Sequence, residues 1–361
     1  MPQESAPLRV VVVGPGAVGS FLGGTLAAAG CDVVLLGRRI PEGADATRLV
    51  IEEPGGSRTV PVRRVSDPAD AGRPDLVILA VKAFDVEAGL ATAARWPAVP
   101  LMTVQNGAGA EEAAQAARTS PVLAGSLTTA VEPATGGVRR LRTGGMGVAA
   151  LPGEGAPVAS ALAVRLAAAW TAAGLPARVY PDAAAMKWSK LLANLVGNAT
   201  SAILDMDPGR VYADRAGFHV ERRQLREAVA VMRATGLRPI TLPGADVSLL
   251  LRGLALPEVI GRPIVARAIA GARGGKSPSL RLHVRGGGEG SGVAPAAGPT
   301  EARWLNGAVA TAGGRAGVPA PVNACLAALV DECAADPARA AWFAGRPDRL
   351  AEAIARWEAA S

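Results

Sequence analysis

The sequence predicts an α/β fold in which a mostly parallel sheet in the first half of the chain is followed by an all-helical domain. Up to residue 181, short valine-rich runs alternate with helical segments, which is the pattern of a parallel sheet covered by helices. Beyond that residue the alternation stops and helical periodicity takes over. We therefore expect a tail over residues 1–8, a sheet domain over 9–181 and a helical domain over 182–361.

Length and composition narrow the class of protein. A chain of 361 residues is long enough for two domains with cores of their own. Half of the residues are hydrophobic, which is typical of a globular protein and not of a disordered one. The net charge is +7, but the basic residues are scattered and aromatic residues are scarce, so we expect no nucleic-acid partner. An anionic cofactor and substrate account for the charge equally well.

The cysteines and histidines show no metal-binding pattern. Cys31, Cys325 and Cys333 have neither disulfide nor zinc spacing, and His219 lies far from His283 in sequence. We therefore expect no metal site and a reducing compartment, the cytoplasm. The sequence leaves a monomer and a homodimer both open.

The first strand runs into a glycine-rich turn. Arg9–Val13 carries four valines, which suits a strand buried on both faces. Gly14, Gly16 and Gly19 follow with the spacing G-x-G-x-x-G, and a helix and a second strand over 32–36 come next. In a Rossmann-type unit these glycines permit the tight turn, the approach of a pyrophosphate and close packing of helix on strand. The amino terminus of that helix attracts phosphate.

The end of the second strand indicates which dinucleotide is bound. An NAD site usually has a carboxylate there for the ribose hydroxyl, whereas this chain has Gly37-Arg38-Arg39. Two guanidinium groups suit the 2′-phosphate of NADPH or NADP+, and Arg38 comes first after the strand. The alternative is that both arginines are solvated loop charges.

The same opening stretch has a rival interpretation. The run from Val10 to Cys31 carries no charge and could be a signal peptide or a membrane span. Pro15 and the glycines break it where an apolar helix would be continuous, and Asp32 follows. We therefore expect no membrane segment.

Later strands place polar residues at the carboxyl edge of the sheet, where open α/β sheets bind ligands. The strand over 75–81 ends at Lys82, and the strand over 100–104 ends at Gln105-Asn106-Gly107. Asn106-Gly107 on its own is also typical of a simple turn. Its position after a strand favours a binding role.

The first helix of the second domain carries a polar stripe. Asp182 is the expected cap of a helix over 183–203. At 100° per residue one narrow face collects Lys190, Asn194, Asn198 and Ser201. An ordinary solvent face would use Glu, Lys and Arg, since each asparagine costs about half a kcal/mol relative to alanine. The stripe therefore favours a cleft for a small polar anion. Lys187 lies on roughly the same face, so spacing alone does not choose between the two lysines.

The remaining chain is predicted to form helices and one loop. In the helix Phe218–Ala234 the charged residues are expected on a solvated face: Glu221, Arg222, Arg223, Arg226 and Glu227. Glycine, proline and alanine over 285–299 predict a flexible loop. Thr300 is the expected cap of the next helix, with Glu301 in its first turn.

Several motifs occur along the chain in a set order. They are Gly14-Pro15-Gly16-Ala17-Val18-Gly19, Val81-Lys82-Ala83, Gln105-Asn106-Gly107, Lys187-Trp188-Ser189-Lys190-Leu191 with Asn194 and Asn198, Pro278-Ser279-Leu280, and Thr300-Glu301 with Leu305-Asn306-Gly307. With these motifs the sequence resembles the ketopantoate reductase (2-dehydropantoate 2-reductase) family of the 6-phosphogluconate dehydrogenase-like superfamily, over nearly the whole chain.

The resemblance implies an oxidoreductase that reduces a 2-oxo acid with NADPH, in the best-known members ketopantoate to pantoate in pantothenate biosynthesis. It selects Lys190 as the proton donor, with Glu301 near both ligands. The implied cofactor contacts are Gly14, Pro15, Gly16, Ala17, Val18, Gly19, Arg38, Lys82, Asn106, Ala130 and Glu301. The implied substrate contacts are Asn106, Asn194, Asn198 and Ser279.

Three positions depart from the family pattern. Arg281 stands in the stretch after Ser279 where an acidic residue is common, Arg303 replaces the aspartate of Thr-Glu-Ile-Asp, and Pro208 aligns with a further asparagine. These departures keep three alternatives open. They are a paralogue for another 2-oxo acid, a dehydrogenase that decarboxylates or condenses its substrate, and a non-catalytic NADP-binding sensor.

Overall fold

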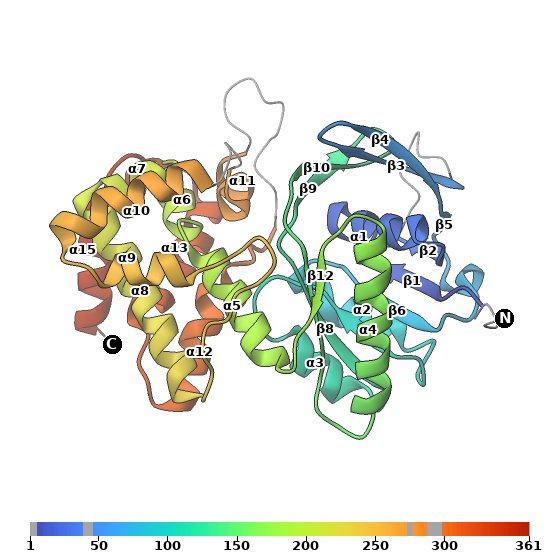
Figure 1. The fold of residues 1–361 in the computed structure, drawn as a ribbon. Helices are drawn as coiled ribbons and strands as arrows, with labels where there is room; N and C mark the ends of the chain where they lie inside the picture. Colours follow the sequence, from blue (N-terminus) through green and yellow to red (C-terminus); the bar gives the residue numbers. More distant parts are fainter. Residues whose placement is uncertain (1–5, 39–45, 273–276, 287–297, 361) are drawn as a thin grey trace. The chain divides into compact units, whose positions relative to one another are not determined.

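The computed structural model describes residues 6–38, 46–272, 277–286 and 298–360, and the chain forms two compact units (Figure 1). Unit 1 comprises Met1–Gln105, Gly109–Lys187 and Leu242–Ala245, and unit 2 comprises Asn106–Ala108, Trp188–Thr241 and Asp246–Ser361. Most of the predicted tail, and residues 287–297 of the predicted loop, lie outside the described residues.

Unit 1 is built on an eight-stranded sheet with the order β12-β11-β8-β7-β6-β1-β2-β5. All neighbouring strands are parallel except β8 and β11, so the predicted mostly parallel sheet is confirmed. Buried aliphatic side chains fill the central strands on both faces, because helices cover both. The strands are β1 (Arg9–Val13), β2 (Asp32–Leu36), β5 (Arg63–Val65), β6 (Leu76–Leu79), β7 (Leu101–Thr103), β8 (Val122–Leu127), β11 (Met146–Ala150) and β12 (Ala177–Val179).

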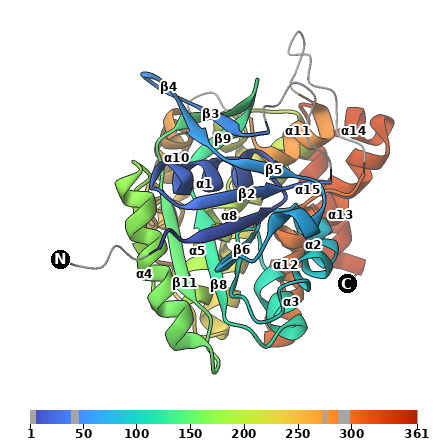
Figure 2. The same ribbon diagram turned by 90° about the vertical axis from the view of Figure 1, so that its right-hand side faces the viewer.

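Helices cover both faces of this sheet (Figure 2). Helices α1 (Ala17–Ala28) and α4 (Ala156–Ala172) pack on each other, as do α2 (Val86–Ala93) and α3 (Ala110–Ala117). Helix α1 also packs against a second sheet with the order β4-β3-β10-β9. Its strands are β3 (Arg48–Glu53), β4 (Gly56–Pro61), β9 (Ala130–Ala134) and β10 (Gly137–Arg142).

The uncharged run that begins at Val10 forms β1, the glycine turn and α1. Among the described residues, no helix combines the length and the apolar character needed to cross a membrane.

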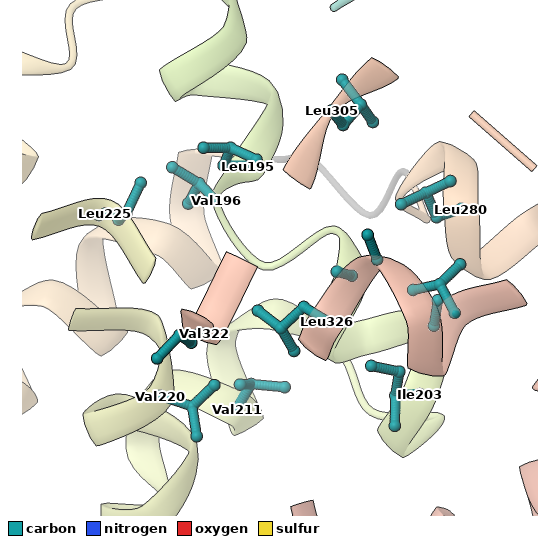
Figure 3. Packing of buried hydrophobic residues seen from close by; sticks show 14 of the residues in the cluster. Leu195, Val196, Ile203, Val211, Val220, Leu225, Leu280, Leu305, Val322 and Leu326 are labelled. Carbon is teal, nitrogen blue, oxygen red and sulfur yellow. The ribbon is translucent and has the colours of Figure 1, made fainter. Parts of the chain in front are cut away.

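Unit 2 is helical and has its own core, in which aliphatic side chains from many helices meet (Figure 3). Helix α5 (Ala183–Leu195) begins in unit 1 and continues into unit 2, and the side chain of Asp182 caps it through the amide of Ala185 at 2.9 Å, as predicted. The others are α6 (Ala199–Leu204), α7 (Pro208–Ala213), α8 (Arg215–Ala234), α9 (Ser248–Ala255), α10 (Glu258–Ala272), α11 (Ser279–Arg285), α12 (Asn306–Ala316), α13 (Pro321–Ala335), α14 (Pro337–Phe343) and α15 (Pro347–Ala360).

The single helix predicted over 183–203 is wrong. The chain leaves the helix after Leu195 and α6 begins at Ala199, because Gly197 adopts a left-handed φ of +60°. A Cβ atom at Gly197 would also lie only 2.7 Å from the Cβ of Pro208. Ser201 is therefore fully buried on a different helix and does not extend the stripe of Lys190 and Asn194.

The solvated face predicted for α8 is also wrong in part. Glu221 is completely buried. Glu227 is half-buried and accepts the backbone amides of Val322 and Asn323 at 3.0 Å, which caps the start of α13. Helical periodicity places charges on faces of a helix, but it does not show which neighbouring helices cover those faces.

Burial makes a prediction for the cysteines. Burial raises the pKa of Cys325 to about 12 and that of Cys333 to about 11, and both side chains are almost fully buried in α13. Because the thiolate is the reactive form, we expect iodoacetamide at neutral pH to modify half-buried Cys31 first and the other two only after unfolding. Peptide mass mapping checks this, and equal labelling of all three thiols in the folded protein would contradict it.

Candidate functional site

The glycine turn of unit 1 has the geometry of a dinucleotide-binding loop. Gly14 has φ +89°, and a Cβ there would lie 2.6 Å from the Val81 side chain. A Cβ at Gly19 would lie 2.4 Å from the carbonyl oxygen of Gly14, so helix and strand pack too closely for any side chain. At Gly16, by contrast, a Cβ would meet nothing within 4 Å. The turn is therefore closed where the backbone must bend and open where a phosphate would approach.

The start of α1 is suited to an anion. Gly16 is its N-cap and supplies no side-chain bond, so the first amides of the helix are not capped from within the loop. Such amides and the positive end of the helix dipole favour phosphate. The residues present thus fit a pyrophosphate.

Three further predicted cofactor residues lie in unit 1. Arg38 follows β2 with a side chain that is 93% exposed, and it forms an ion pair with Asp85 at 4.0 Å. Lys82 follows β6 at the carboxyl edge of the sheet, and Ala130 is the first residue of β9. Arg39 lies outside the described residues.

Lys187 is held in a buried ion pair. Its ammonium group lies 3.0 Å from Glu111 Oε1 and donates to the carbonyl oxygens of Gln105 at 2.6 Å and Gly125 at 3.4 Å. The hydroxyl of Thr103 donates to the same carboxylate oxygen at 2.7 Å. An ammonium group has three N–H donors, and Lys187 has one acceptor for each. These contacts engage the whole ammonium group of Lys187 and fix the start of α5.

Lys190 and Asn194 lie one helical turn apart on α5, both half-buried. In unit 2 the amide of Asn194 donates to Asn106 Oδ1 at 3.1 Å. The structure thus brings together two of the predicted substrate residues, although they are far apart in sequence. Asn106 is exposed.

A second pair of predicted substrate residues also meets in unit 2. Asn198 Nδ2 lies 3.5 Å from the hydroxyl of Ser279, and Asn198 Oδ1 accepts the amide of Leu280 at 3.1 Å. Asn198 is almost fully buried while Ser279 is exposed. The side chain of Asn198 therefore anchors the first turn of α11, on which Ser279 stands.

Glu301 is buried at the start of a short 3-10 turn, η3 (Ala302–Trp304). The hydroxyl of Thr300 accepts the amide of Ala302 at 3.1 Å. The prediction that Thr300 caps an α-helix with Glu301 in its first turn is nevertheless wrong, because only the 3-10 turn follows and α12 begins at Asn306 with Leu305 as its N-cap. The carbonyl of Trp304 accepts the amide of Ala108 at 3.1 Å. The segment that carries Asn106 thus packs against the segment that follows Glu301.

The three departures from the family pattern occupy defined places. Arg281 forms ion pairs with Asp205 at 3.1 Å and Asp207 at 2.6 Å. Pro208 begins α7 and packs against Gly197. Arg303 is exposed, with its guanidinium 5.8 Å from the centre of the Trp304 ring.

Sequence reasoning missed the roles of two residues, Glu111 and Gln105. Glu111 has the pattern of an ordinary first-turn carboxylate of α3 and becomes the partner of Lys187 only through the fold. Gln105 donates to the carbonyls of Leu79 at 2.8 Å and Val81 at 3.1 Å, which joins the ends of β6 and β7. Gln105 stands in the motif Gln105-Asn106-Gly107, but the motif does not show which carbonyls its side chain contacts.

Comparison with known proteins gives consistent results. Residues 10–152 match the family described as ketopantoate reductase PanE/ApbA, and residues 182–287 match its C-terminal region. The chain is 30% identical over 331 residues to a 2-dehydropantoate 2-reductase of Halobacterium salinarum, which covers 90% of this chain and 98% of that protein. A 2-dehydropantoate 2-reductase of Pyrococcus horikoshii is 28% identical and covers 64% of this chain and 75% of its own length.

Solved structures with similar folds include two of interest. A PanE/ApbA family ketopantoate reductase from Ralstonia eutropha is 28% identical, with a TM-score of 0.70, and the match covers 90% of this chain and 98% of that one. A D-mandelate dehydrogenase with NADH and anilino(oxo)acetate has a TM-score of 0.68 at 18% identity, over 90% of this chain and 98% of that one, which shows a shared fold.

Proposed function

Because this chain belongs to the ketopantoate reductase family, we propose that it reduces a 2-oxo acid to a 2-hydroxy acid with NADPH, ketopantoate being the first candidate substrate. The chain is an oxidoreductase of that family. The observation that carries the proposal is that, in unit 2, Asn106 meets Asn194, one turn from Lys190 on α5, and Asn198 meets Ser279.

In this proposal unit 1 binds the cofactor. The amides at the start of α1 would hold the pyrophosphate, and Arg38 would hold the 2′-phosphate. When bound, the nicotinamide supplies a hydride to the keto carbon of the oxo acid.

Lys190 would act on the keto oxygen. Negative charge develops on that oxygen as the carbonyl is reduced, and an ammonium group placed beside it stabilises the charge. Lys190 then donates a proton and the alcohol forms. Glu301, which is buried, would hold the substrate hydroxyl or orient Lys190.

Amide and hydroxyl groups would hold the substrate carboxylate. Asn194, Asn198 and Ser279 can donate hydrogen bonds to it without the repulsion that an acidic side chain would cause. Arg281, which is already paired with Asp205 and Asp207, is committed to the fold.

A second candidate function is the reduction of a 2-oxo acid other than ketopantoate. The exposed Arg303, in place of the family's aspartate, favours this alternative because it changes the charge close to Glu301.

Oxidation of NADPH with a panel of 2-oxo acids tests the proposal. The highest kcat/KM with ketopantoate supports pantoate formation, and a higher value with another oxo acid identifies a paralogue. Product analysis would reveal a decarboxylating or condensing reaction. Cofactor binding without turnover of any member of the panel would indicate a sensor and overturn the proposal.

The cofactor preference can be tested at Arg38. A hydrogen bond to a charged group contributes about 1.5–3 kcal/mol, so we expect Arg38→Ala to lower kcat/KM for NADPH about 10- to 100-fold. The value for NADH should change little. Arg95→Ala, which removes another exposed arginine of unit 1, is the control. An unchanged NADPH to NADH ratio in Arg38→Ala would show that the 2′-phosphate is held elsewhere.

A further inference from the structure

Glu221 is an acidic residue buried without a charged partner in its hydrogen bonds. It lies on α8 with none of its surface exposed. Its carboxylate accepts the hydroxyl of Thr200 at 2.6 Å, the hydroxyl of Tyr212 at 2.6 Å and the amide of Gly197 at 3.0 Å. Burial raises the pKa of Glu221. Burial of a carboxyl group costs free energy, and an apolar residue at this position would avoid that cost. The hydrogen bonds of Glu221 therefore suggest that it has a specific role.

The side chain of Gln224, on the same helix, is a fourth hydrogen-bond donor to this carboxylate, and the other three donors come from separate segments of unit 2. Thr200 stands on α6 and Tyr212 on α7, both fully buried, and Gly197 lies in the turn between α5 and α6. Only the bond from Gly197 holds a residue outside regular helix. That glycine has a left-handed φ and nearly touches Pro208, so the turn has little freedom to take another path.

The turn held by Glu221 sets the position of Asn198, which directly follows Gly197 in the chain. Asn198 Oδ1 accepts the amide of Leu280, and its Nδ2 approaches the hydroxyl of Ser279. A displaced turn would withdraw the acceptor from Leu280 and separate Asn198 from Ser279. The chain of contacts thus runs from the Glu221 carboxylate, through the Gly197 amide, to the start of α11.

We propose that Glu221 is a positioning residue for the binding of the substrate carboxylate. It fixes the Gly197–Asn198 turn, and this turn positions the pair Asn198 and Ser279. The inference rests on the proposed function, because Asn198 and Ser279 are the groups assigned to the substrate. It adds a residue that does not itself touch the oxo acid.

The test compares variants by two readouts. In Glu221→Leu we expect KM for the oxo acid to rise about tenfold or more, because Asn198 and Ser279 would no longer be placed to hydrogen-bond the substrate carboxylate. The values of kcat and of NADPH affinity should change little. Hydrogen exchange at the Leu280 amide should accelerate, because its acceptor moves away. Glu221→Gln should restore both readouts, since an amide oxygen can still accept from Gly197.

Thr200→Val is the matched control. It removes another hydrogen bond of the same carboxylate but leaves the bond to Gly197 in place, so KM and Leu280 exchange should stay at the wild-type values. If Glu221→Leu does not fold, Glu221→Asp replaces it as the test. Its side chain is shorter by one methylene and should not reach the Gly197 amide, so we again expect a higher KM and faster Leu280 exchange. Wild-type KM and Leu280 exchange in Glu221→Leu, or in Glu221→Asp where that variant replaces it, would overturn the inference, as would an equal rise of KM in Thr200→Val. Failure of the wild-type protein to reduce any oxo acid would instead overturn the proposed function, and Leu280 exchange would still test the turn.

Discussion

Lys190→Met is expected to lower kcat about 10²- to 10⁴-fold, the usual contribution of a positioned general acid. The substitution keeps the length of the side chain and removes both the positive charge and the proton. Lys190 is half-buried on α5 next to Asn194, so the variant should fold and bind NADPH normally. Steady-state kinetics, cofactor titration by fluorescence and thermal melting measure the three quantities.

Lys187→Met is the matched control, because it makes the same change one turn earlier on the same helix. We expect its kcat, measured on folded protein, to stay within about tenfold of the wild-type value, which is about 1.4 kcal/mol of activation free energy. A kcat of Lys190→Met equal to that of the wild type would refute the assignment of the proton donor. A collapse of kcat in Lys187→Met alone would transfer that role to Lys187.

Lys187→Met should instead cause a large loss of stability. Lys187 and Glu111 are both almost fully buried and lie 3.0 Å apart. Removal of one partner leaves a buried charge without compensation, which costs about 3–5 kcal/mol. The carbonyl of Gln105 would lose its 2.6 Å donor as well. Chemical denaturation measures the change in the free energy of unfolding.

A double variant separates the ion pair from the packing around it. The double variant Lys187→Met with Glu111→Gln has no charged side chain at either position. The amide oxygen introduced at position 111 can accept the hydrogen bond from the Thr103 hydroxyl that the carboxylate accepts in the wild type. Since neutral replacement of a buried pair is often tolerated, we expect the double variant to recover much of the lost stability. A double variant as unstable as Lys187→Met would show that the lysine acts through packing and the carbonyls of Gln105 and Gly125.

The fold was largely predictable because its signals are local. Valine-rich strands, the glycine spacing and the change to helical periodicity each depend on residues close together in sequence. The glycine turn behaves as its spacing predicts, with Gly14 and Gly19 in close contacts and Gly16 open. The second sheet depends instead on long-range pairing, since the pairing of β3 with β10 joins segments far apart in the chain.

The candidate site was predicted as a set of residues but not as an arrangement. Helical spacing placed Lys190, Asn194 and Asn198 on one continuous stripe, whereas Gly197 ends the helix between the second and the third. A glycine is tolerated within a helical pattern, so its presence alone does not locate a break. The contact with Pro208 and the amide bond to Glu221 are the tertiary features that accompany the break.

The sequence by itself determined the class of fold, the dinucleotide turn, the arginine behind β2 and the order of residues that identifies the family. These are properties of neighbouring residues and of their types. Only the tertiary structure decided that Lys187 is bound to Glu111, that Glu221 is buried and that Asn106 meets Asn194. Periodicity tells which residues share a face of a helix, but the partner of that face comes from distant parts of the chain, and the partner determines whether a charge is solvated, structural or available for chemistry.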